Sequence, residues 1–355
     1  MKIALDISHI ADNNFLQHRV RGAGFYVNNL VESLRKYFPQ NEYLLIERGQ
    51  KLPQNIDLVH YPYFEPFFLS LPFSKKLPTV VTVHDLTPLV FPEQFPRGIK
   101  GEIKWQRQKL ALKNSTAIIT DSENSKKDIL KFAGISSEKI HVIYLAAGEK
   151  FMKLPARIAT QSVAGGEIKK KYNLPEKFVF YVGDVTWNKN LPRLIKAMKH
   201  LELPLVMVGK TLVSVDFDRN NPWNHDLIEV QNLTRNNPKI ICLGFVSTED
   251  LVKIYNLATV FATPSLYEGF GLPVLEAMSC GCPVIAGKAG SLPEIVGKAG
   301  ISVDPNNTEE IGKKLLDVIN LSRQEREEII RKGLMQSKKF SWEKTAAETV
   351  RVYEN

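Results

Sequence analysis

Short apolar runs alternate with amphipathic stretches along the first half of the chain. Residues 25–38 place their apolar side chains at a helical period, and a second helix is expected from about Ser125 to Phe132. The apolar runs are rich in Val and Ile, and they cover residues 2–7, 43–47, 57–61, 79–85, 117–122 and 139–145. Such runs, bounded by turn residues and separated by helices, predict a parallel sheet that is covered on both faces.

The pattern is interrupted at residues 154–166 and then starts again. This stretch has no clear period and ends in two glycines, so we interpret it as the connection between two domains. Apolar runs then return, with predicted helices between them, at residues 178–184, 204–210, 239–245, 259–265, 283–287 and 301–304. The second half therefore predicts another doubly wound α/β unit.

A length of 355 residues also favours two domains, since one domain usually contains about 100–200 residues. We predict an α/β fold of two Rossmann-like domains, at residues 1–165 and 166–340. The charged helix at about 341–355 is expected to pack back on the first domain. Two such domains in series place the carboxyl ends of both sheets at an interdomain cleft, where open α/β folds bind ligands.

The composition restricts the class of protein. Hydrophobic residues make up 44% and charged residues 24% of the chain, as in ordinary globular proteins. Cys242, Cys280 and Cys282 are too few for a disulfide scaffold or a zinc site, so we expect small buried residues. No leader sequence opens the chain and no run approaches about 18 apolar residues, which predicts a cytoplasmic protein.

The positive charge is concentrated in the first half. The formal net charge is +9, and residues 1–165 hold 22 Lys and Arg against 15 Asp and Glu, a net charge of +7. A basic surface attracts phosphate-bearing partners or an anionic membrane. Nucleic acid is not expected as a partner, because we find no RNP-like aromatic motif, zinc finger or basic heptad.

One basic stretch has two interpretations. Residues 97–113 contain six Lys or Arg and one acid, with Ile99, Ile103 and Leu110 at near-helical spacing. The stretch is either an ordinary surface helix that packs its Ile and Leu inward, or an amphipathic helix in peripheral contact with an anionic membrane. The apolar residues from Phe64 to Phe73 are likewise either core or a loop at the acceptor side.

Two glycine-containing turns are candidate anion sites. Gly22-Ala23-Gly24 precedes the predicted helix at 25–38, and free amides at a helix N-terminus favour an anion. The segment 264–283, PSLYEGFGLPVLEAMSCGCP, places Glu268 before a Gly-Phe-Gly turn and Glu276 on the first turn of the next helix. Two carboxylates that flank such a turn either accept hydrogen bonds from ligand hydroxyls or are surface residues at a tight junction.

This segment resembles the E-x7-E signature of glycosyltransferase family 4, the group 1 glycosyltransferases. Further segments resemble the same family in order along nearly the whole chain: VVTVHDLTP, IITDSENSKKDI, YVGDVTWNKNL, LGFVSTEDL, GSLPEIVG and FSWEKTA. The resemblance implies the GT-B fold, in which two Rossmann-like domains face across a donor-binding cleft. It also implies retaining transfer of a hexose from a nucleotide-diphosphate sugar, GDP-mannose-like or UDP-linked. The acceptor would be a hydroxyl of a glycan or of a lipid-linked acceptor in polysaccharide or glycolipid assembly.

The resemblance implies roles for individual residues. Glu268 matches the glutamate that binds donor-sugar hydroxyls, Glu276 the ribose-binding glutamate, and Lys189 the lysine that neutralises the diphosphate. A cation at that place stabilises the leaving-group charge more in the transition state than in the ground state. The other donor-side matches are the turn at 22–24, the amides of Gly269, Phe270, Gly271 and Leu272, and the base-packing residues Phe245 and Val246, which are otherwise strand-end core.

Residues of the first domain receive roles from the same resemblance. His84 matches a residue near the 6-OH of the donor sugar, and Asp121, Ser122 and Glu123 are expected on the acceptor side. We assign no protein nucleophile, because family analogy attributes retention to front-face attack, with the donor phosphate taking the acceptor proton. No metal or other cofactor is expected, because positive groups and helix amides can do what a divalent ion would otherwise do.

One motif departs from the family, in which many relatives carry an arginine just after the glycine or just before the lysine. Asp184 and Asn188 stand at these positions. The diphosphate is then held by Lys189 alone, or together with Arg193 or Lys210. Three alternatives stay open: another GT-B enzyme such as a nucleotide-sugar epimerase or a phosphorylase, a Rossmann dehydrogenase, which the missing third glycine disfavours, and a non-catalytic, membrane-docked binding protein.

Overall fold

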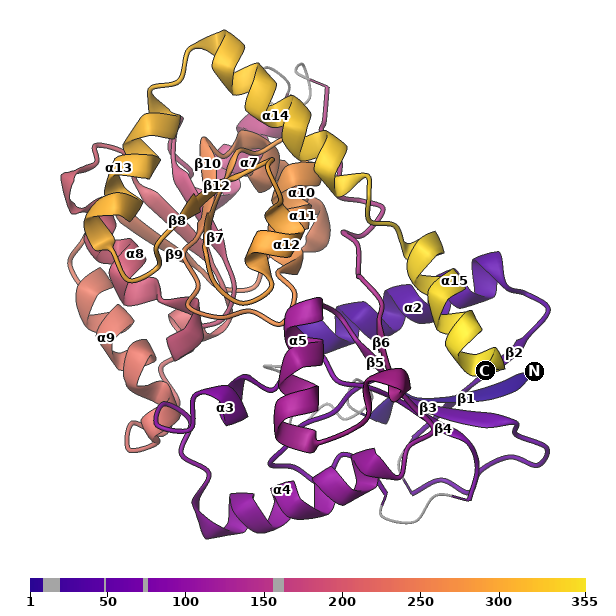
Figure 1. The fold of residues 1–355 in the computed structure, drawn as a ribbon. Helices are drawn as coiled ribbons and strands as arrows, with labels where there is room; N and C mark the ends of the chain where they lie inside the picture. The colour runs from indigo at the N-terminus through magenta and orange to yellow at the C-terminus, as the bar shows by residue number, and fades with distance from the viewer. Residues whose placement is uncertain (9–19, 48, 73–75, 156–162) are drawn as a thin grey trace. The chain divides into compact units, whose positions relative to one another are not determined.

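The computed structural model describes residues 1–8, 20–47, 49–72, 76–155 and 163–355, which form two compact α/β units (Figure 1). Unit 1 contains Met1–Ala146 and Phe340–Asn355, and unit 2 contains Ala147–Lys339. The division falls after Ala146, whereas the sequence pattern indicates residue 165. Of the predicted connection at 154–166, residues 156–162 lie outside the described residues.

Unit 2 begins at Ala147, earlier than predicted, because side chains farther along unit 2 bind the residues that follow Ala147. The backbone amide of Leu154 donates a hydrogen bond to Asn256 Oδ1 at 2.8 Å. The ammonium of Lys150 pairs with Glu249 Oε1 at 2.6 Å. Neither contact leaves a periodic pattern in the sequence, so the pattern places the boundary too late.

Unit 1 is built on six parallel strands in the order β2-β1-β3-β4-β5-β6. The strands are β1 (Lys2–Asp6), β2 (Glu42–Ile46), β3 (Leu58–Tyr61), β4 (Thr79–Thr82), β5 (Ala117–Thr120) and β6 (Ile140–Val142). The central strands are buried on both faces, which explains their nearly continuous apolar runs. The chain order reverses between β1 and β3, so the topological switch point of this sheet lies there.

The helical segments of unit 1 include one at its C-terminal end. They are η1 (Val20–Gly24), α2 (Phe25–Tyr37), α3 (Thr87–Val90), α4 (Gly98–Lys113), α5 (Glu123–Asp128), η2 (Ile129–Ala133), η3 (Ser137–Lys139) and α15 (Trp342–Glu354). The turn η1 runs directly into α2, and Gly24 has right-handed helical φ and ψ. The expected free helix N-terminus at Phe25 is therefore wrong, because helical turns already begin at Val20.

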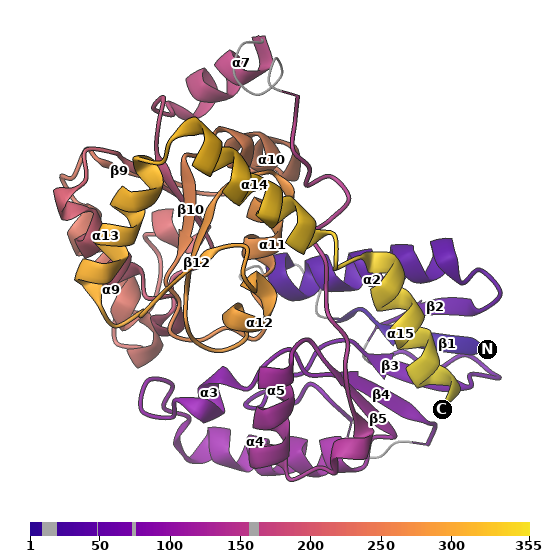
Figure 2. The same cartoon turned by 45° about the horizontal axis from the view of Figure 1, so that its top comes forward.

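Helix α15 packs along α2 within unit 1 (Figures 1 and 2). The ring of Trp342 meets that of Phe25 edge-on, with 6.2 Å between the ring centres. The buried ring of His60 in β3 bridges the Tyr353 hydroxyl at 2.7 Å and the Thr82 hydroxyl at 2.8 Å. Burial lowers the pKa of His60 to about 3, so the ring stays neutral and links α15 to the sheet.

Unit 2 also has six parallel strands, in the order β12-β11-β10-β7-β8-β9. The strands are β7 (Val179–Val182), β8 (Leu205–Val208), β9 (Ile240–Leu243), β10 (Val260–Thr263), β11 (Val284–Gly287) and β12 (Ile301–Val303). The first strand of the unit, β7, lies beside the fourth, β10. The switch point of this sheet therefore lies between β7 and β10.

Helices cover both faces of the second sheet. They are α7 (Val163–Tyr172), η4 (Trp187–Lys189), α8 (Leu191–Ala197), η5 (Met198–His200), η6 (Thr211–Val213), η7 (Pro222–Asn224), α9 (His225–Thr234), α10 (Thr248–Leu257), α11 (Leu272–Ser279), α12 (Leu292–Val296), α13 (Thr308–Ile319) and α14 (Arg323–Ser337). Helices α8, α9 and α13 lie on one face, and α10, α11 and α12 lie on the other (Figure 1).

Alternate side chains of β7 fill the two cores of unit 2. Val179 and Tyr181 belong to the apolar cluster beneath α8, α9 and α13. Phe180 points to the opposite face, where its ring lies 5.0 Å from that of Tyr255 in α10. Among the described residues, none of the helices is both long and apolar enough to cross a membrane.

Candidate functional site

The candidate site of unit 2 lies at the switch point of its sheet. Lys189 ends η4, which follows β7, and Glu268 lies in the loop after β10. Because β7 and β10 are neighbouring parallel strands, the loops at their carboxyl ends meet. This topology brings together two residues that lie 79 positions apart in the chain.

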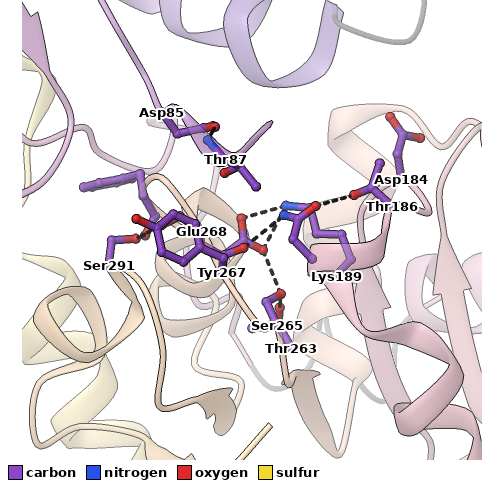
Figure 3. Close-up of polar contacts among 12 residues, drawn as sticks. Asp85, Thr87, Asp184, Thr186, Lys189, Thr263, Ser265, Tyr267, Glu268 and Ser291 are labelled. Atoms are coloured by element: carbon purple, nitrogen blue, oxygen red, sulfur yellow. Dashed lines mark hydrogen bonds and ion pairs between the residues drawn. The ribbon is translucent and has the colours of Figure 1, made fainter. Parts of the chain in front are cut away.

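Lys189 and Glu268 form an ion pair in which both carboxylate oxygens take part (Figure 3). The Lys189 ammonium lies 2.8 Å from Oε1 and 2.6 Å from Oε2. The Ser265 hydroxyl donates a second hydrogen bond to Oε1 at 2.7 Å. The side chain of Lys189 is 27% exposed and that of Glu268 12%. The pair is thus held by hydrogen bonds but remains partly accessible to solvent. The ammonium can therefore bind an anion, and the carboxylate can accept hydrogen bonds from ligand hydroxyls.

Asn190 fixes the Lys189 loop to the loop of Glu268. Its backbone is left-handed, with a φ of 60°, a conformation that asparagine tolerates better than most residues. Its buried amide donates hydrogen bonds to the carbonyls of Pro264 at 2.8 Å and Pro305 at 2.6 Å. The guanidinium of Arg193 donates to Asn190 Oδ1 at 2.8 Å. Arg193, one of the two proposed second cations, therefore supports the loop.

Asn188 is one of the two positions at which the resemblance leads us to expect an arginine. Its backbone carbonyl accepts a hydrogen bond from Leu266 at 2.8 Å, and its side-chain amide donates to the Tyr267 carbonyl at 3.0 Å. The Thr186 hydroxyl donates to Asn188 Oδ1 at 2.8 Å. Asn188 therefore holds the segment that precedes Glu268, and it supplies no charge.

The glycine turn after Glu268 leads into helix α11. Gly271 has a φ of 105°, which favours glycine, and it directly precedes the first residue of the helix. A Cβ atom at Gly290 would lie 2.7 Å from the amide nitrogen of Glu268, so only glycine allows this approach. The Ser291 hydroxyl donates to the carbonyls of Glu268 at 3.0 Å and Phe270 at 2.8 Å. The turn is thus fixed, and the amides at the start of α11 favour an anion.

Glu276 is a buried carboxylate on α11. It is 8% exposed, and the Tyr255 hydroxyl donates a hydrogen bond to its Oε2 at 2.9 Å. Burial, and then the charge of Glu276, raise the pKa of Tyr255 well above its ordinary value. Tyr255 therefore remains a donor at all ordinary pH values and fixes the orientation of the Glu276 carboxylate.

The predicted base-packing residues after β9 differ in exposure. Phe245 is 66% exposed, and the Lys210 ammonium lies 5.7 Å from the centre of its ring. Val246 is 2% exposed and is part of the core. Of the two, only Phe245 presents a face that a planar ring could cover.

Unit 1 holds a second pair of ionisable groups. His84 follows β4, Asp121 follows the neighbouring strand β5, and His84 Nδ1 lies 2.6 Å from Asp121 Oδ2. The ring of Tyr26 meets that of His84 edge-on at 4.8 Å. Burial alone lowers the pKa of His84, but the charge and hydrogen bond of Asp121 outweigh it, so the pKa is raised. Burial raises the pKa of Asp121. Within the described part of the chain, His84 Nε2 and Asp121 Oδ1 have no hydrogen-bond partner.

The other predicted residues of unit 1 have different surroundings. Ser122 is fully buried, and its hydroxyl accepts a hydrogen bond from the Ser125 amide at 3.0 Å as the N-cap of α5. Glu123 is exposed on the first turn of that helix. Gly22 is exposed, whereas Ala23 is buried at 8% exposure. The structure thus joins the side chain of Asp121 to that of His84, and Ser122 hydrogen bonds to Ser125, whose hydroxyl donates to the His84 carbonyl at 2.9 Å.

Sequence reasoning missed the residues that hold the site in place. These are Ser265, Ser291, Asn190 and Tyr255, and each contacts a carbonyl or a carboxylate of the site. Ser265 lies three residues before Glu268, a spacing that could have indicated a local hydrogen bond. Ser291 and Tyr255 come from other loops and helices, and no local pattern connects them to the site.

Both units of the chain match models of known protein families. Residues 166–335 match the family model described as glycosyl transferases group 1, and residues 10–146 match that of glycosyltransferase family 4. The chain is 32% identical over 309 residues to O-antigen chain mannosyltransferase B of Escherichia coli, covering 84% of this chain and 75% of that protein. The chain belongs to the group 1 glycosyltransferases. It is therefore a glycosyltransferase enzyme.

A second relative is much longer than this glycosyltransferase. The serotype-specific mannosyltransferase WbdA of Escherichia coli is 31% identical over 279 residues, which are 76% of this chain but 32% of WbdA. The matched region is thus about one third of that protein.

Solved structures show the same GT-B fold. Sucrose-phosphate synthase of Thermosynechococcus elongatus superposes with a TM-score of 0.76 at 18% identity, over 100% of this chain and 98% of that one. HepE of Anabaena, solved in complex with UDP and glucose, gives a TM-score of 0.71 at 17% identity, over 100% of both chains. The predicted α/β fold class is therefore confirmed.

Proposed function

We propose that this glycosyltransferase transfers a hexose, with mannose as the first candidate, from a nucleotide-diphosphate sugar to a hydroxyl of a glycan or lipid-linked acceptor. The observation that carries the proposal is the Lys189–Glu268 pair at the switch point of unit 2, next to the amides that begin α11. Mannose is favoured because two relatives above 30% identity are named mannosyltransferases. HepE, which shares the fold, was solved with UDP and with UDP-glucose, so a uridine donor is the second choice.

Each group of the unit 2 site has a role in this proposal. The Glu268 carboxylate accepts hydrogen bonds from sugar hydroxyls, and the Lys189 ammonium leaves it to bind the diphosphate. The backbone amides from Gly269 to Leu272 also face the negative diphosphate. The Glu276 carboxylate accepts hydrogen bonds from the ribose hydroxyls. Because the negative charge of the leaving group grows as the glycosidic bond breaks, Lys189 and these amides stabilise the transition state more than bound substrate.

We further propose retention at the anomeric carbon without a protein nucleophile. The acceptor hydroxyl attacks the face that the diphosphate leaves, and the leaving phosphate takes its proton. His84 is proposed to contact the donor sugar. This scheme leaves Glu268 as a binding residue: it accepts hydrogen bonds from the sugar hydroxyls once Lys189 has turned to the diphosphate, and the Ser265 hydroxyl keeps its carboxylate oriented.

The proposed reaction needs no metal ion or other cofactor. Lys189 and the amides at the start of α11 supply the positive potential that a divalent ion would give to the diphosphate. Two aspartates separated by one residue, Asp216 and Asp218, have the spacing of a metal-binding Asp-x-Asp motif; both are exposed, and Asp218 Oδ1 accepts a hydrogen bond from the Asn220 amide at 2.9 Å.

A donor panel tests the proposal. Thermal unfolding is measured with GDP-mannose, UDP-glucose and an ADP-sugar, since a ligand that binds only the folded protein raises the melting temperature. We expect the largest increase with GDP-mannose. Transfer to an acceptor is then followed by NMR of the anomeric proton, which must show the donor's configuration. No stabilisation by any nucleotide sugar would overturn the donor site, and an inverted product would overturn retention.

The alternative GT-B activities, a nucleotide-sugar epimerase and a phosphorylase, gain no support from these relatives. The proposal that transfer needs no metal ion is tested by adding EDTA to the transfer assay. Activity that EDTA abolishes and a divalent ion restores would contradict it.

A further inference from the structure

The last helix of the chain is more deeply buried than the apolar segments on the surface of unit 1. Helix α4 exposes its large aliphatic side chains, which are Ile99 (82%), Ile103 (52%) and Leu110 (51%), so the interpretation that it packs them inward is wrong. In the apolar segment 64–73, Phe68 and Leu69 are exposed, and residue 73 lies outside the described part of the chain. Helix α15, in contrast, buries Trp342 and Tyr353, each to 4% exposure. The side chains of α15 therefore take part in the interior of unit 1.

A buried chain of hydrogen bonds runs from α15 through the sheet to α2. The Tyr353 hydroxyl lies 2.7 Å from His60 Nδ1 in β3, and His60 Nε2 lies 2.8 Å from the hydroxyl oxygen of Thr82 in β4. The same oxygen of Thr82 lies 3.0 Å from the hydroxyl oxygen of Tyr26 in α2. His60 and Thr82 are fully buried, and Tyr26 is 1% exposed. Because water does not reach these atoms, the chain holds the four side chains in one arrangement.

Thr82 is the middle link of this chain. The low pKa of His60, about 3, keeps its ring neutral, so one ring nitrogen donates and the other accepts. If His60 accepts from Tyr353, it donates to Thr82, and the Thr82 hydroxyl then donates to Tyr26. The reverse direction also uses every proton once, and in both directions Thr82 accepts one hydrogen bond and donates the other. Removal of the Thr82 hydroxyl therefore breaks two buried hydrogen bonds at once.

Tyr26 extends this arrangement to His84. The rings of Tyr26 and His84 meet edge-on, with 4.8 Å between the ring centres and 85° between the ring planes. Asp121 Oδ2 fixes His84 at Nδ1, 2.6 Å away, but the second side-chain torsion of a histidine has a broad minimum, so one hydrogen bond leaves the plane of the ring partly free. The edge-on contact with Tyr26 restricts that rotation. The direction of His84 Nε2 therefore depends on where the Tyr26 ring lies.

Both ends of α15 support Tyr26. The ring centre of Trp342, the first residue of the helix, lies 6.2 Å from that of Tyr26. Tyr353, near the other end of the helix, reaches Tyr26 through His60 and Thr82. These contacts lie within unit 1, although the helix follows unit 2 in the chain. The end of the chain thus supports the surroundings of His84.

We propose that Tyr26 and Thr82 are positioning residues for His84, and that α15 holds both of them in place. Tyr26 sets the direction of His84 Nε2, Thr82 sets the position of Tyr26, and neither touches substrate. The positioning role rests on the proposed function, in which His84 contacts the donor sugar. A displaced Nε2 should therefore lower turnover. Binding of a free nucleoside diphosphate should not change, because its proposed partners are Lys189 and the amides that begin α11.

Two threonines of β4 provide a matched pair of variants. Thr82→Val removes the middle hydroxyl of the chain, and Thr79→Val removes a hydroxyl that donates to the Leu77 carbonyl at 2.9 Å. Both threonines are buried, at 0% and 2% exposure, so both variants should lower the melting temperature. Only Thr82→Val should move the NMR signals of the His84 ring protons, since these protons sense a displacement of the adjacent Tyr26 ring. The seven histidines are labelled in their rings, and the His84 signals are those that His84→Gln lacks.

Turnover provides a second measurement. Hydrolysis of GDP-mannose, in which water replaces the acceptor, is followed by the release of GDP. Thr82→Val should lower kcat by about tenfold, which is less than the factor of about 100 that a displacement of 1 Å can cost. Thr79→Val should keep the wild-type kcat. The increase in melting temperature with GDP should be the same in the wild type and in both variants.

A conservative variant separates the hydroxyl from packing. Thr82→Ser keeps the hydroxyl and loses only the methyl group, so it should lower the melting temperature yet retain the wild-type His84 signals and most of the turnover. Tyr353→Phe breaks the far end of the chain and leaves the contact between Thr82 and Tyr26. It should therefore move the His84 signals in the same sense as Thr82→Val, but less far.

Several results would overturn the positioning role. His84 signals that stay in place in Thr82→Val, or that move equally in Thr79→Val, would contradict it, as would Thr82→Ser that is as impaired as Thr82→Val. Shifted signals with unchanged hydrolysis would show that turnover does not depend on the direction of the His84 ring. If Thr82→Val does not fold, unchanged His84 signals in Tyr353→Phe would equally overturn it. Wild-type protein that neither binds nor hydrolyses GDP-mannose would contradict the proposed donor instead, and the NMR comparison would still decide whether the chain positions His84.

Discussion

The two units carry their ionisable pairs at different points of similar sheets. In unit 2 the Lys189–Glu268 pair lies at the switch point, between the loops after β7 and β10. In unit 1 the His84–Asp121 pair follows β4 and β5, away from the switch point between β1 and β3. Both pairs lie at the carboxyl ends of parallel strands, but only one occupies the place where strand order reverses.

The difference in position goes with a difference in hydrogen bonding. Both oxygens of Glu268 are engaged, and the side chain of Lys189 is 27% exposed, so these groups are accessible to a ligand. Asp121 is 3% exposed, and one atom of each group in its pair has no hydrogen-bond partner in the described structure. The proposed function therefore requires the unit 2 pair to rearrange on ligand binding, whereas the carboxylate of the unit 1 pair is held in a buried position.

The largest expected effect is that of Glu268→Gln on turnover. The variant keeps the size of the side chain but replaces charge-assisted hydrogen bonds to sugar hydroxyls by weaker neutral ones, so kcat should fall by about 10- to 100-fold. Binding of the free nucleoside diphosphate should be retained or become tighter, because Lys189 loses its competing carboxylate. Steady-state kinetics and calorimetry measure the two quantities. Unchanged turnover in a folded variant would remove Glu268 from the site.

Lys189→Ala should weaken binding of the nucleoside diphosphate itself. A charge-assisted bond to phosphate is lost, so the dissociation constant should rise by about tenfold or more. Lys210→Ala is the matched control, because Lys210 lies at the base-packing residue Phe245 and not at Glu268. If calorimetry shows the loss in Lys210→Ala and not in Lys189→Ala, Lys210 holds the phosphates and the proposed role of the ion pair is wrong.

Tyr353→Phe tests how much the buried hydrogen bond between the Tyr353 hydroxyl and His60 stabilises unit 1. The substitution leaves His60 Nδ1 buried without its hydrogen bond to the Tyr353 hydroxyl, so the free energy of unfolding should fall by about 1–3 kcal/mol. Urea unfolding of the full chain measures it, with the half-buried Tyr37→Phe as the control. Equal losses in the two variants would mean that the bridge to α15 contributes nothing specific.

The smallest expected effect is that of Asp121→Asn on the pH dependence of the free energy of unfolding. The folded-state pKa of His84 lies above its ordinary value of 6.5, so protonation of His84 stabilises wild-type protein most at pH below 6.5. That stability should be lost as the pH rises through the raised pKa. Asparagine removes the charge that opposes burial, so the pKa of His84 should fall. NMR titration of the histidine ring measures it.

His60 gives an internal check on this titration. Its pKa is lowered to about 3 by burial, so its contribution to stability is lost as the pH falls from 6.5 towards 3, in a separate window. An unchanged pKa of His84 in Asp121→Asn would show that the Asp121 charge does not control the ring.

The strands and most helices could be predicted because each carries a local signal. The predicted helix at 25–38 matches α2, and the predicted helix that carries Glu276 follows the glycine turn as α11. The helical turn η1 could not be predicted from the glycines, because Gly24 is also compatible with right-handed helix. The unit boundary depends on contacts of Leu154 with a residue that lies 102 positions away.

The sequence by itself determined the two α/β units, the glycine turn and the family of this glycosyltransferase, because apolar periods and motifs are local in the chain. Only the tertiary structure decided which residues meet: Glu268 with Lys189, and Asp121 with His84. It also decided that Ile99 faces outward although its spacing fits either side of a helix. Strand order and the rotation of a helix follow from packing between distant segments, and no local pattern records that packing.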